Sequence, residues 1–391
     1  MANQRIVVAF VIIAGFAGLL ACRKTAPSSQ LPNNNSNAAA SPTQNAPVGG
    51  SIAPTGERFY FRGSIANNLK VEMNLVRDGD QLNGTYFYPR VGKNINLKGK
   101  IDNADNVDLR ETDDSGKETG VFKGKWKPST EEPNTGLNEI EGKWTRPDGT
   151  RETSFQVTQQ PINFTASVSV APKIVKEVNK EKHYSVNAEY PQISGDPRFD
   201  KFNRETRNLI MKDMAAFKTA ETSSAEEPTA DLPEETQTST LDIVYDIRYA
   251  TDDLISVEFG EGQYSRGAAH PNSATAVLNF DVKNGKKLAL ADLFSPNSKY
   301  LDVIAEYCIK ALQDRARKDK EGMLTTDMIK SGASGRLDNY RAVSITKKGL
   351  WVTFDPYQVA PYAVGPQYVM VPYSALKDII KPNGPIGNLA K

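Results

Sequence analysis

The chain has 391 residues, of which 39% are hydrophobic and 24% are charged, so it is long enough for two soluble domains with cores of their own. Lysine and arginine number 48 and aspartate and glutamate 47, a balance that argues against nucleic acid as a partner. The composition favours protein binding or a structural role over nucleic-acid binding.

The N-terminus has the features of a secretory signal. Arg5 precedes an apolar run over residues 6–18, which is short for a bilayer span, and Leu19, Leu20 and Ala21 lead into Cys22. This sequence resembles a bacterial lipoprotein signal, in which the peptide is cut before the cysteine and that cysteine is acylated, for example with palmitate. We therefore expect residues 1–21 to be a signal peptide and Cys22 to carry lipid that binds the bilayer; an uncleaved membrane anchor is the alternative.

The location follows from the same resemblance. Arg23 rather than aspartate follows the cysteine, which implies the outer membrane, facing the periplasm, if the organism has two membranes, and otherwise the outer face of the cell membrane. Residues 22–56 are rich in Ser, Asn, Ala, Pro and Gln, and we expect a disordered tether. Since Cys308 is the only other cysteine, no internal disulfide is expected, and Cys308 should be buried on a helix.

Residues 57–158 consist of short runs of alternating apolar residues separated by turns. Eight such runs with no helical period predict an all-β antiparallel meander or small barrel. Four of the runs repeat a glycine two residues before a large apolar residue, at Gly84, Gly99, Gly124 and Gly142, as a tight barrel requires where backbones approach closely. Trp126 and Trp144 would belong to the barrel core or line the mouth of a ligand cavity.

Residues 165–391 mix helical and strand periods, after an expected hinge at 159–164. Strands are predicted at 168–178, 184–190, 239–249, 255–264, 276–282, 287–290, 342–346, 350–354 and 368–371. Helices are predicted after Asp196, after Ser295, at 326–330 and at 374–380. Because the helices follow groups of strands, the pattern indicates an α+β domain with an antiparallel sheet and not a doubly wound parallel sheet.

The sequence contains few residues in the patterns that catalysis or metal binding requires. His183 and His270 are the only histidines, and no zinc-binding spacing, nucleophile elbow or phosphate loop is present. Residues 102–108 resemble a calcium loop but lack its glycine and distal glutamate, so we expect a turn between strands. From this we expect no metal, no cofactor and no catalytic residue, although two carboxylates that meet in space cannot be recognised in one sequence.

Four blocks carry a family resemblance: residues 190–193, residues 267–272 leading into 278–281, residues 288–294, and residues 354–365. Together they resemble the extracellular domain of RsiV-type anti-sigma factors, a domain that also occurs in PdaC-type peptidoglycan deacetylases. The resemblance implies binding at the cell envelope, to lysozyme in the RsiV case. Only five residues precede the apolar run, and the metal-binding histidines of a deacetylase domain are missing, so neither activity is expected to carry over.

These observations predict a membrane-tethered envelope lipoprotein whose C-terminal domain binds lysozyme or peptidoglycan without catalysis. The candidate binding residues are Tyr264, Arg266, His270, Tyr357 and Tyr362, with a purely structural turn as the alternative for His270. Two alternatives remain open: a periplasmic carrier with a small apolar ligand inside the barrel, and an unrecognised envelope hydrolase whose carboxylates converge in space.

Overall fold

The structure is a computed structural model that describes residues 56–129, 136–165, 168–223, 233, 236–319 and 322–391. All of these residues belong to one compact unit, Ala53–Lys391. The predicted signal peptide, Cys22 and the tether up to residue 55 lie outside the described residues. Within the described ranges no helix is long and apolar enough to cross a membrane.

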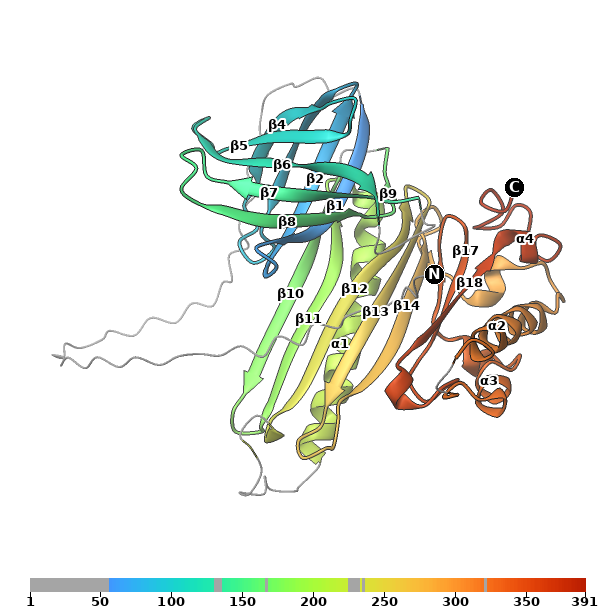
Figure 1. Ribbon diagram of the computed structural model, residues 1–391. Coiled ribbons are helices and arrows are strands. Elements are labelled where there is room, and N and C mark those ends of the chain that lie inside the picture. Colours follow the sequence, from blue (N-terminus) through green and yellow to red (C-terminus); the bar gives the residue numbers. More distant parts are fainter. Residues whose placement is uncertain (1–55, 130–135, 166–167, 224–232, 234–235, 320–321) are drawn as a thin grey trace. The chain divides into compact units, whose positions relative to one another are not determined.

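The first eight strands form a closed antiparallel barrel (Figure 1). They are β1 (Glu57–Ile65), β2 (Leu69–Asp78), β3 (Gln81–Phe87), β4 (Ile95–Ile101), β5 (Asn106–Thr112), β6 (Glu118–Pro128), β7 (Asn138–Thr145) and β8 (Glu152–Gln159). Each strand pairs with the next, and β1 closes the barrel on β8. Every second residue points inward; Val71, Met73 and Leu75 on β2 are each 1% exposed. The predicted all-β barrel is thereby confirmed.

The repeated glycines lie where neighbouring backbones approach each other. Gly124 on β6 is directly opposite Gly142 on β7, and a Cβ on either residue would overlap backbone atoms of the facing strand. Gly84 and Gly99 meet backbone oxygens of their neighbours in the same way. The close approach expected from the repeat is confirmed, and it lets eight strands curve into a narrow barrel.

Side chains fill the barrel interior. Phe59 and Phe61 pack edge-on against Trp126, with ring centroids 4.9 and 5.2 Å apart, and all three are at most 7% exposed. Tyr86 and Trp144 both donate to Glu111, at 2.6 and 3.0 Å, so their polar atoms are satisfied inside the barrel. Trp126 is a core residue, and this dense packing removes the support for a barrel that carries a small ligand.

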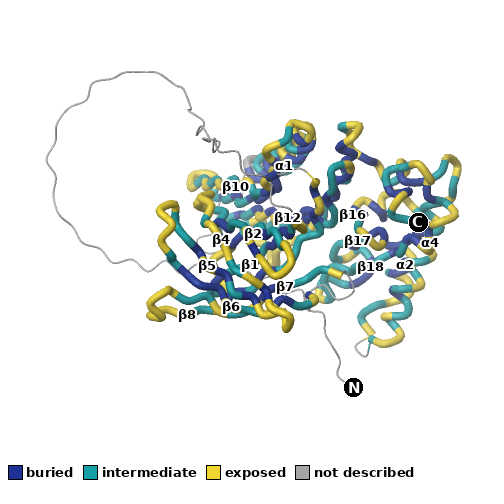
Figure 2. Tube along the Cα trace, turned by 90° about the horizontal axis from the view of Figure 1, so that it is seen from above, coloured by how far each residue is buried: buried dark blue, intermediate teal, exposed yellow. Residues whose placement is uncertain are grey.

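A seven-stranded sheet follows, in the order β10-β11-β12-β13-β14-β15 with β9 paired to β12. Its strands are β9 (Ile162–Asn163), β10 (Ser169–Asn179), β11 (Tyr184–Ser194), β12 (Ser239–Thr251), β13 (Leu254–Tyr264), β14 (Asn272–Asp281) and β15 (Lys286–Lys287). Helix α1 (Asp200–Ser223) runs along one face of this sheet, where Phe202, Ile210 and Phe217 join the buried core. Figure 2 shows the buried residues gathered along the strands and the exposed ones in the connecting loops.

The C-terminal part adds a three-stranded antiparallel sheet, β16 (Val343–Ile345), β17 (Gly349–Phe354) and β18 (Gln367–Pro372). Helices α2 (Tyr300–Ala316), α3 (Thr326–Gly332) and α4 (Tyr373–Leu376) contribute to the core around it. Cys308 on α2 is fully buried in that core, as expected, and burial raises the pKa of its thiol to about 12. The expected α+β class is confirmed.

Several predicted elements differ from the structure. The expected hinge at 159–164 contains β9, which pairs with residues 250–251 of β12. The strand expected at 287–290 ends at Lys287, because a short 3-10 helix, Leu290–Leu293, begins three residues later. The second helix begins at Tyr300 and not after Ser295, and the last helix ends at Leu376.

Candidate functional site

The structure brings three of the five predicted binding residues together. His270, in the loop between β13 and β14, stacks on Tyr362 with ring centroids 4.1 Å apart, and Tyr357 lies 5.5 Å beyond Tyr362. Tyr362 also donates its hydroxyl to the carbonyl oxygen of Pro271 at 2.6 Å. Tyr357 has a positive φ of 69° and is 58% exposed. These three rings form an exposed stack that joins the loop to the segment after β17.

The other two predicted residues have a different environment. The backbone N–H of Arg266 donates to the hydroxyl of Ser239 at 2.9 Å, and the hydroxyl of Tyr264 lies 3.5 Å from the carbonyl oxygen of Thr236. These contacts hold the start of the same loop against Thr236 and against Ser239, the first residue of β12.

A pair of carboxyl groups lies between α1 and β13, and sequence reasoning did not identify it. Asp213 on α1 and Glu261 on β13 are half-buried and lie close enough for each carboxyl to shift the pKa of the other. Burial raises the pKa of Glu261 to about 7, with further contributions from the nearby carboxyl groups of Asp213 and Asp355. Burial also raises the pKa of Asp213 above its usual value. Near neutral pH such a pair holds one proton between two carboxylates.

The position of the pair follows from two ordinary periodicities. Ile255, Val257 and Phe259 point from β13 into the core beside α1, and Glu261 is the next residue on that face. On the helix, Asp213 lies three residues after Ile210 and four before Phe217, both buried. The only signal in the sequence was therefore an acidic residue at a core-facing position of each element.

Asp355 follows β17 and adds a third carboxylate close to this end of β13. It lies close to Thr275, which lowers its pKa, and Thr275 faces Gly260, the neighbour of Glu261. One oxygen of Asp355 and one of Asp213 are buried without a hydrogen-bond partner among the described residues. Burial raises the pKa of Asp355 as well, so acidic groups with raised pKa values gather at this end of β13.

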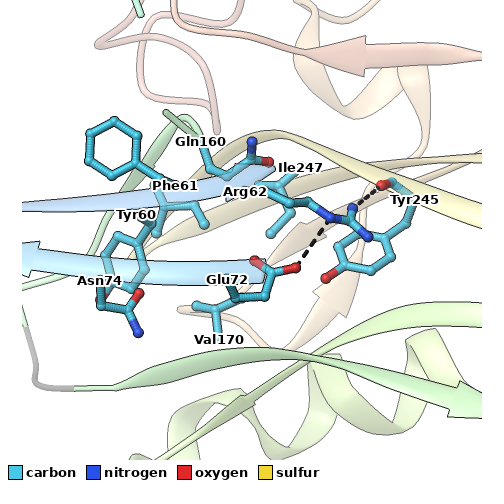
Figure 3. Close-up of a pocket in the computed structure, with 10 residues that line it drawn as sticks. Tyr60, Phe61, Arg62, Glu72, Asn74, Gln160, Val170, Tyr245 and Ile247 are labelled. Atoms are coloured by element: carbon cyan, nitrogen blue, oxygen red, sulfur yellow. Dashed lines mark hydrogen bonds and ion pairs between the residues drawn. The ribbon is translucent and has the colours of Figure 1, made fainter. Parts of the chain in front are cut away.

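A second charged group lies between the barrel and the sheet (Figure 3). Arg62 on β1 pairs with Glu72 on β2 and Glu189 on β11, both at 3.2 Å, and donates to the carbonyl oxygen of Tyr245 at 2.7 Å. Lys70 pairs with the other oxygen of Glu189 at 3.1 Å. The cavity beside these residues measures about 10 Å³, room for one water at most. This group therefore joins two parts of the fold and cannot admit a substrate.

Metal binding was tested against the donors present. Within the described ranges no group of three or more His, Cys, Asp or Glu side chains could hold a metal ion. Burial raises the pKa values of Asp213 and Glu261, which favours their protonated forms, whereas a bound cation requires ionised carboxylates. The chemistry that this site supports is proton transfer between carboxyl groups and a water molecule.

Two family models match the C-terminal half of the chain. The one described as Deacetylase PdaC matches residues 177–273, and the one described as a protein of unknown function (DUF3298) matches residues 291–374. Asp213, Glu261 and His270 lie inside the first match, and Asp355 and Tyr362 inside the second.

One curated relative is the peptidoglycan-N-acetylmuramic acid deacetylase PdaC of Bacillus subtilis, 26% identical over 214 residues. The alignment covers 54% of this chain and 42% of the relative, so the chain spans less than half the length of that protein.

Two solved structures of DUF3298 family proteins are also similar. The protein from Pseudomonas aeruginosa is 19% identical with a TM-score of 0.43, over 56% of this chain and 96% of that one. The protein from Bacteroides fragilis is 18% identical with a TM-score of 0.42, over 58% and 98%.

These comparisons correct two predictions. The match to the Deacetylase PdaC model and to a deacetylase relative contradicts the expectation of a non-catalytic binding domain, and with it the expectation that the chain is not an enzyme. The sequence offered no catalytic motif, and carboxyl groups 48 positions apart, such as Asp213 and Glu261, are brought together only by the fold.

Proposed function

We propose that this protein is a cell-envelope hydrolase that removes acetyl groups from an N-acetylated wall glycan, with Asp213 and Glu261 as its acid–base pair. The observation that carries the proposal is the half-buried carboxyl pair, in which the pKa of Glu261 is raised to about 7, inside the region that matches the Deacetylase PdaC model. The name of the Bacillus subtilis relative supports the choice of an acetylated sugar as substrate.

The pair supplies the two proton transfers that amide hydrolysis needs. The carboxylate of Asp213 accepts a proton from water while the water oxygen attacks the acetamide carbonyl carbon, and Glu261 donates its proton to the carbonyl oxygen. The tetrahedral intermediate then loses its C–N bond. Asp213 returns its proton to the leaving nitrogen, one hydroxyl proton returns to Glu261, and acetic acid and a free amine are released; the acid then ionises to acetate as its proton passes to the amine.

We assign substrate contact to the stacked rings of His270, Tyr357 and Tyr362. Tyr357 presents a large rigid surface with little conformational entropy to lose, and apolar sugar faces pack well on such rings. Tyr264 and Arg266 position the loop in this proposal and do not contact substrate, because their hydrogen bonds to Thr236 and Ser239 fix the start of the loop that carries His270.

The proposal includes export and a lipid anchor. The run Leu-Leu-Ala-Cys at residues 19–22 supports cleavage before Cys22, acylation of Cys22 and tethering to a bilayer by the residues that follow. A wall glycan lies within reach of such a tether. The predicted division into domains at 57–158 and 165–391 is part of this proposal, and the resemblance to RsiV-type domains, with lysozyme as a partner, stays a prediction.

Acetate release from acetylated peptidoglycan tests the proposal directly. We expect the chain to release acetate near neutral pH and expect Glu261→Gln and Asp213→Asn each to lower kcat by at least about 100-fold. Asp246→Asn is the matched control, because this carboxylate on β12 is 65% exposed and takes no part in the pair. If the wild-type chain releases no acetate, or if all three variants match it, the proposed reaction is wrong.

A further inference from the structure

Strand β10 is the outermost strand of the seven-stranded sheet (Figure 1). It pairs with β11 over all eleven of its residues, and no other described strand pairs with it. A long edge strand presents a row of N–H and C=O groups that can accept a further strand. The edge lies far from Asp213 and Glu261 in the strand order, since β11 and β12 separate it from β13.

Two prolines show which groups face outward along this edge. Pro172 on β10 lies directly opposite Pro191 on β11, and a pair without N–H groups must occupy a non-hydrogen-bonded position. The odd-numbered residues of β10 therefore bond to β11, and the even-numbered residues direct their N–H and C=O groups outward. Pro172 interrupts this outward row, whereas Ile174, Lys176 and Val178 continue it to the end of the strand.

The outward-facing part also exposes apolar side chains. Val178 is 69% exposed, and Ile174 and Val175 are partly exposed, on a strand that is otherwise rich in lysine. We propose that this part of β10 pairs antiparallel with β10 of a second copy of the chain, so that the two sheets continue across a two-fold axis.

Charge complementarity selects one register for this pairing. Opposite hydrogen-bonded residues must both be even-numbered, and placing Ile174 opposite Lys176 sets Val175 against itself and Lys173 against Glu177 on both sides of the axis. If the register is shifted by two residues so that its centre moves toward the C-termini of the two strands, Lys176 lies opposite Lys176, and a further shift of two residues places Glu177 opposite Glu177. A shift of two residues in the opposite direction, toward the N-termini, places Lys173 opposite Val175, so that the ion pairs are lost.

Glu177 is already held in place for such a contact. Its carboxylate accepts from Lys218 of α1 at 2.5 Å and from the hydroxyl of Tyr184 at 2.7 Å. Lys173 is exposed two residues from the axis on the same face of the strand. The register therefore brings an exposed cation to a carboxylate with little rotamer freedom left to lose.

A charge-swap experiment tests the register. The unit of residues 53–391 contains every buried cluster and leaves out Cys22, so it is used in analytical ultracentrifugation at about 0.1 mM, where a weak dimer populates. We expect a dimer, with Lys173→Glu and Glu177→Lys each weakening it by about 10-fold or more and an equimolar mixture of the two variants restoring it. A monomeric wild-type unit, or a mixture that dimerises no better than either variant alone, would overturn the proposal.

Disulfide trapping gives a second, geometric readout. Directly opposite non-hydrogen-bonded residues have Cα atoms about 4.5 Å apart, within disulfide range, so Val175→Cys should link two copies under mild oxidation. Val178→Cys is the matched control: this position is more exposed, yet in the proposed register it lies opposite Pro172 and not opposite itself. Trapping at 178 but not at 175 would mean another occupant or register at this edge and would refute the pairing.

Discussion

Glu261 shows how one residue acquires a chemical role from its place in two layers. It is the first charged residue on the helix-facing side of β13 after three buried apolar ones, and Asp213 meets it from α1. Burial raises both pKa values because the charged forms lose hydration, and the negative charge of Asp213 raises the pKa of Glu261 further. The proposed reaction depends on the proton that this arrangement retains.

The pH dependence of the proposed activity belongs to this scale. The activity of the wild-type chain should fall as pH rises through about 7, where the pair loses the proton that Glu261 donates. Asp355→Asn removes a negative charge that raises the pKa of Glu261, so the falling limb should move to lower pH by some tenths of a unit. A pH–rate profile measures this, with Asp246→Asn as the unshifted control; a limb that moves to higher pH would contradict the assignment.

Glu72 predicts a pH dependence of stability. Burial raises its pKa to about 7 against the attraction of Arg62, so folding favours the protonated form. A carboxyl whose folded pKa lies above its unfolded value weakens the fold as pH rises between the two. Chemical denaturation should therefore show wild-type stability falling by on the order of 1–3 kcal/mol between pH 4.5 and 7.

Glu72→Gln is the variant that isolates this effect. It keeps an oxygen acceptor for Arg62 without the ionisation, so its stability should depend less on pH and exceed that of the wild type above pH 7. Glu152→Gln, on the barrel surface with a 57% exposed carboxylate, serves as the control. Equal pH slopes in Glu72→Gln and the wild type would show that Glu72 is not the group responsible.

At the scale of elements, the barrel was predictable because each strand has a recognisable pattern within its own short stretch of sequence. Period-2 alternation, turn residues and the glycine repeat gave eight strands and their closure. The elements near the C-terminus were harder to predict. The helix expected after Ser295 begins only at Tyr300, because residues 295–299 form a turn in which the N–H of Ser295 donates to the carbonyl oxygen of Ile379. That contact spans 84 positions and leaves no local pattern.

The glycines of the repeat should be essential for the stability of the barrel. Gly142→Ala places a Cβ against the backbone of β6, which cannot yield without opening the strand pair, and should destabilise the barrel by about 2 kcal/mol or more. Gly262→Ala on β13 is the matched control, since its Cβ would meet nothing closer than 3.9 Å, and it should change stability by less than about 1 kcal/mol. Thermal unfolding measures both, and equal losses would refute close approach as the reason for the repeat.

At the scale of the whole molecule, the contacts between barrel and sheet were beyond sequence reasoning, which expected a hinge there. Tyr60 of β1 packs with Phe164 and belongs to the core of the sheet, and Arg62 inserts between Glu72 and Glu189. A half-buried arginine that pairs with a glutamate 127 positions away has no periodic or motif signature. The same is true of the pair formed by Asp213 and Glu261, which is why the candidate site was missed while the fold class was found.

We expect the ion pair of Glu189 to be required for the barrel and the sheet to unfold in one cooperative transition. Its side chain is buried and accepts from both Arg62 and Lys70, so Glu189→Ala leaves the guanidinium of Arg62 with one carboxylate fewer in a largely enclosed site. We expect a loss of about 3 kcal/mol, the cost of breaking a buried ion pair from one side, and a broadening or splitting of the unfolding transition followed by calorimetry. Lys70→Ala removes the 58% exposed partner of the same carboxylate and should cost less than about 1 kcal/mol. A single sharp transition in Glu189→Ala, with a loss no greater than that of Lys70→Ala, would mean that the apolar contact at Tyr60 couples the two parts by itself.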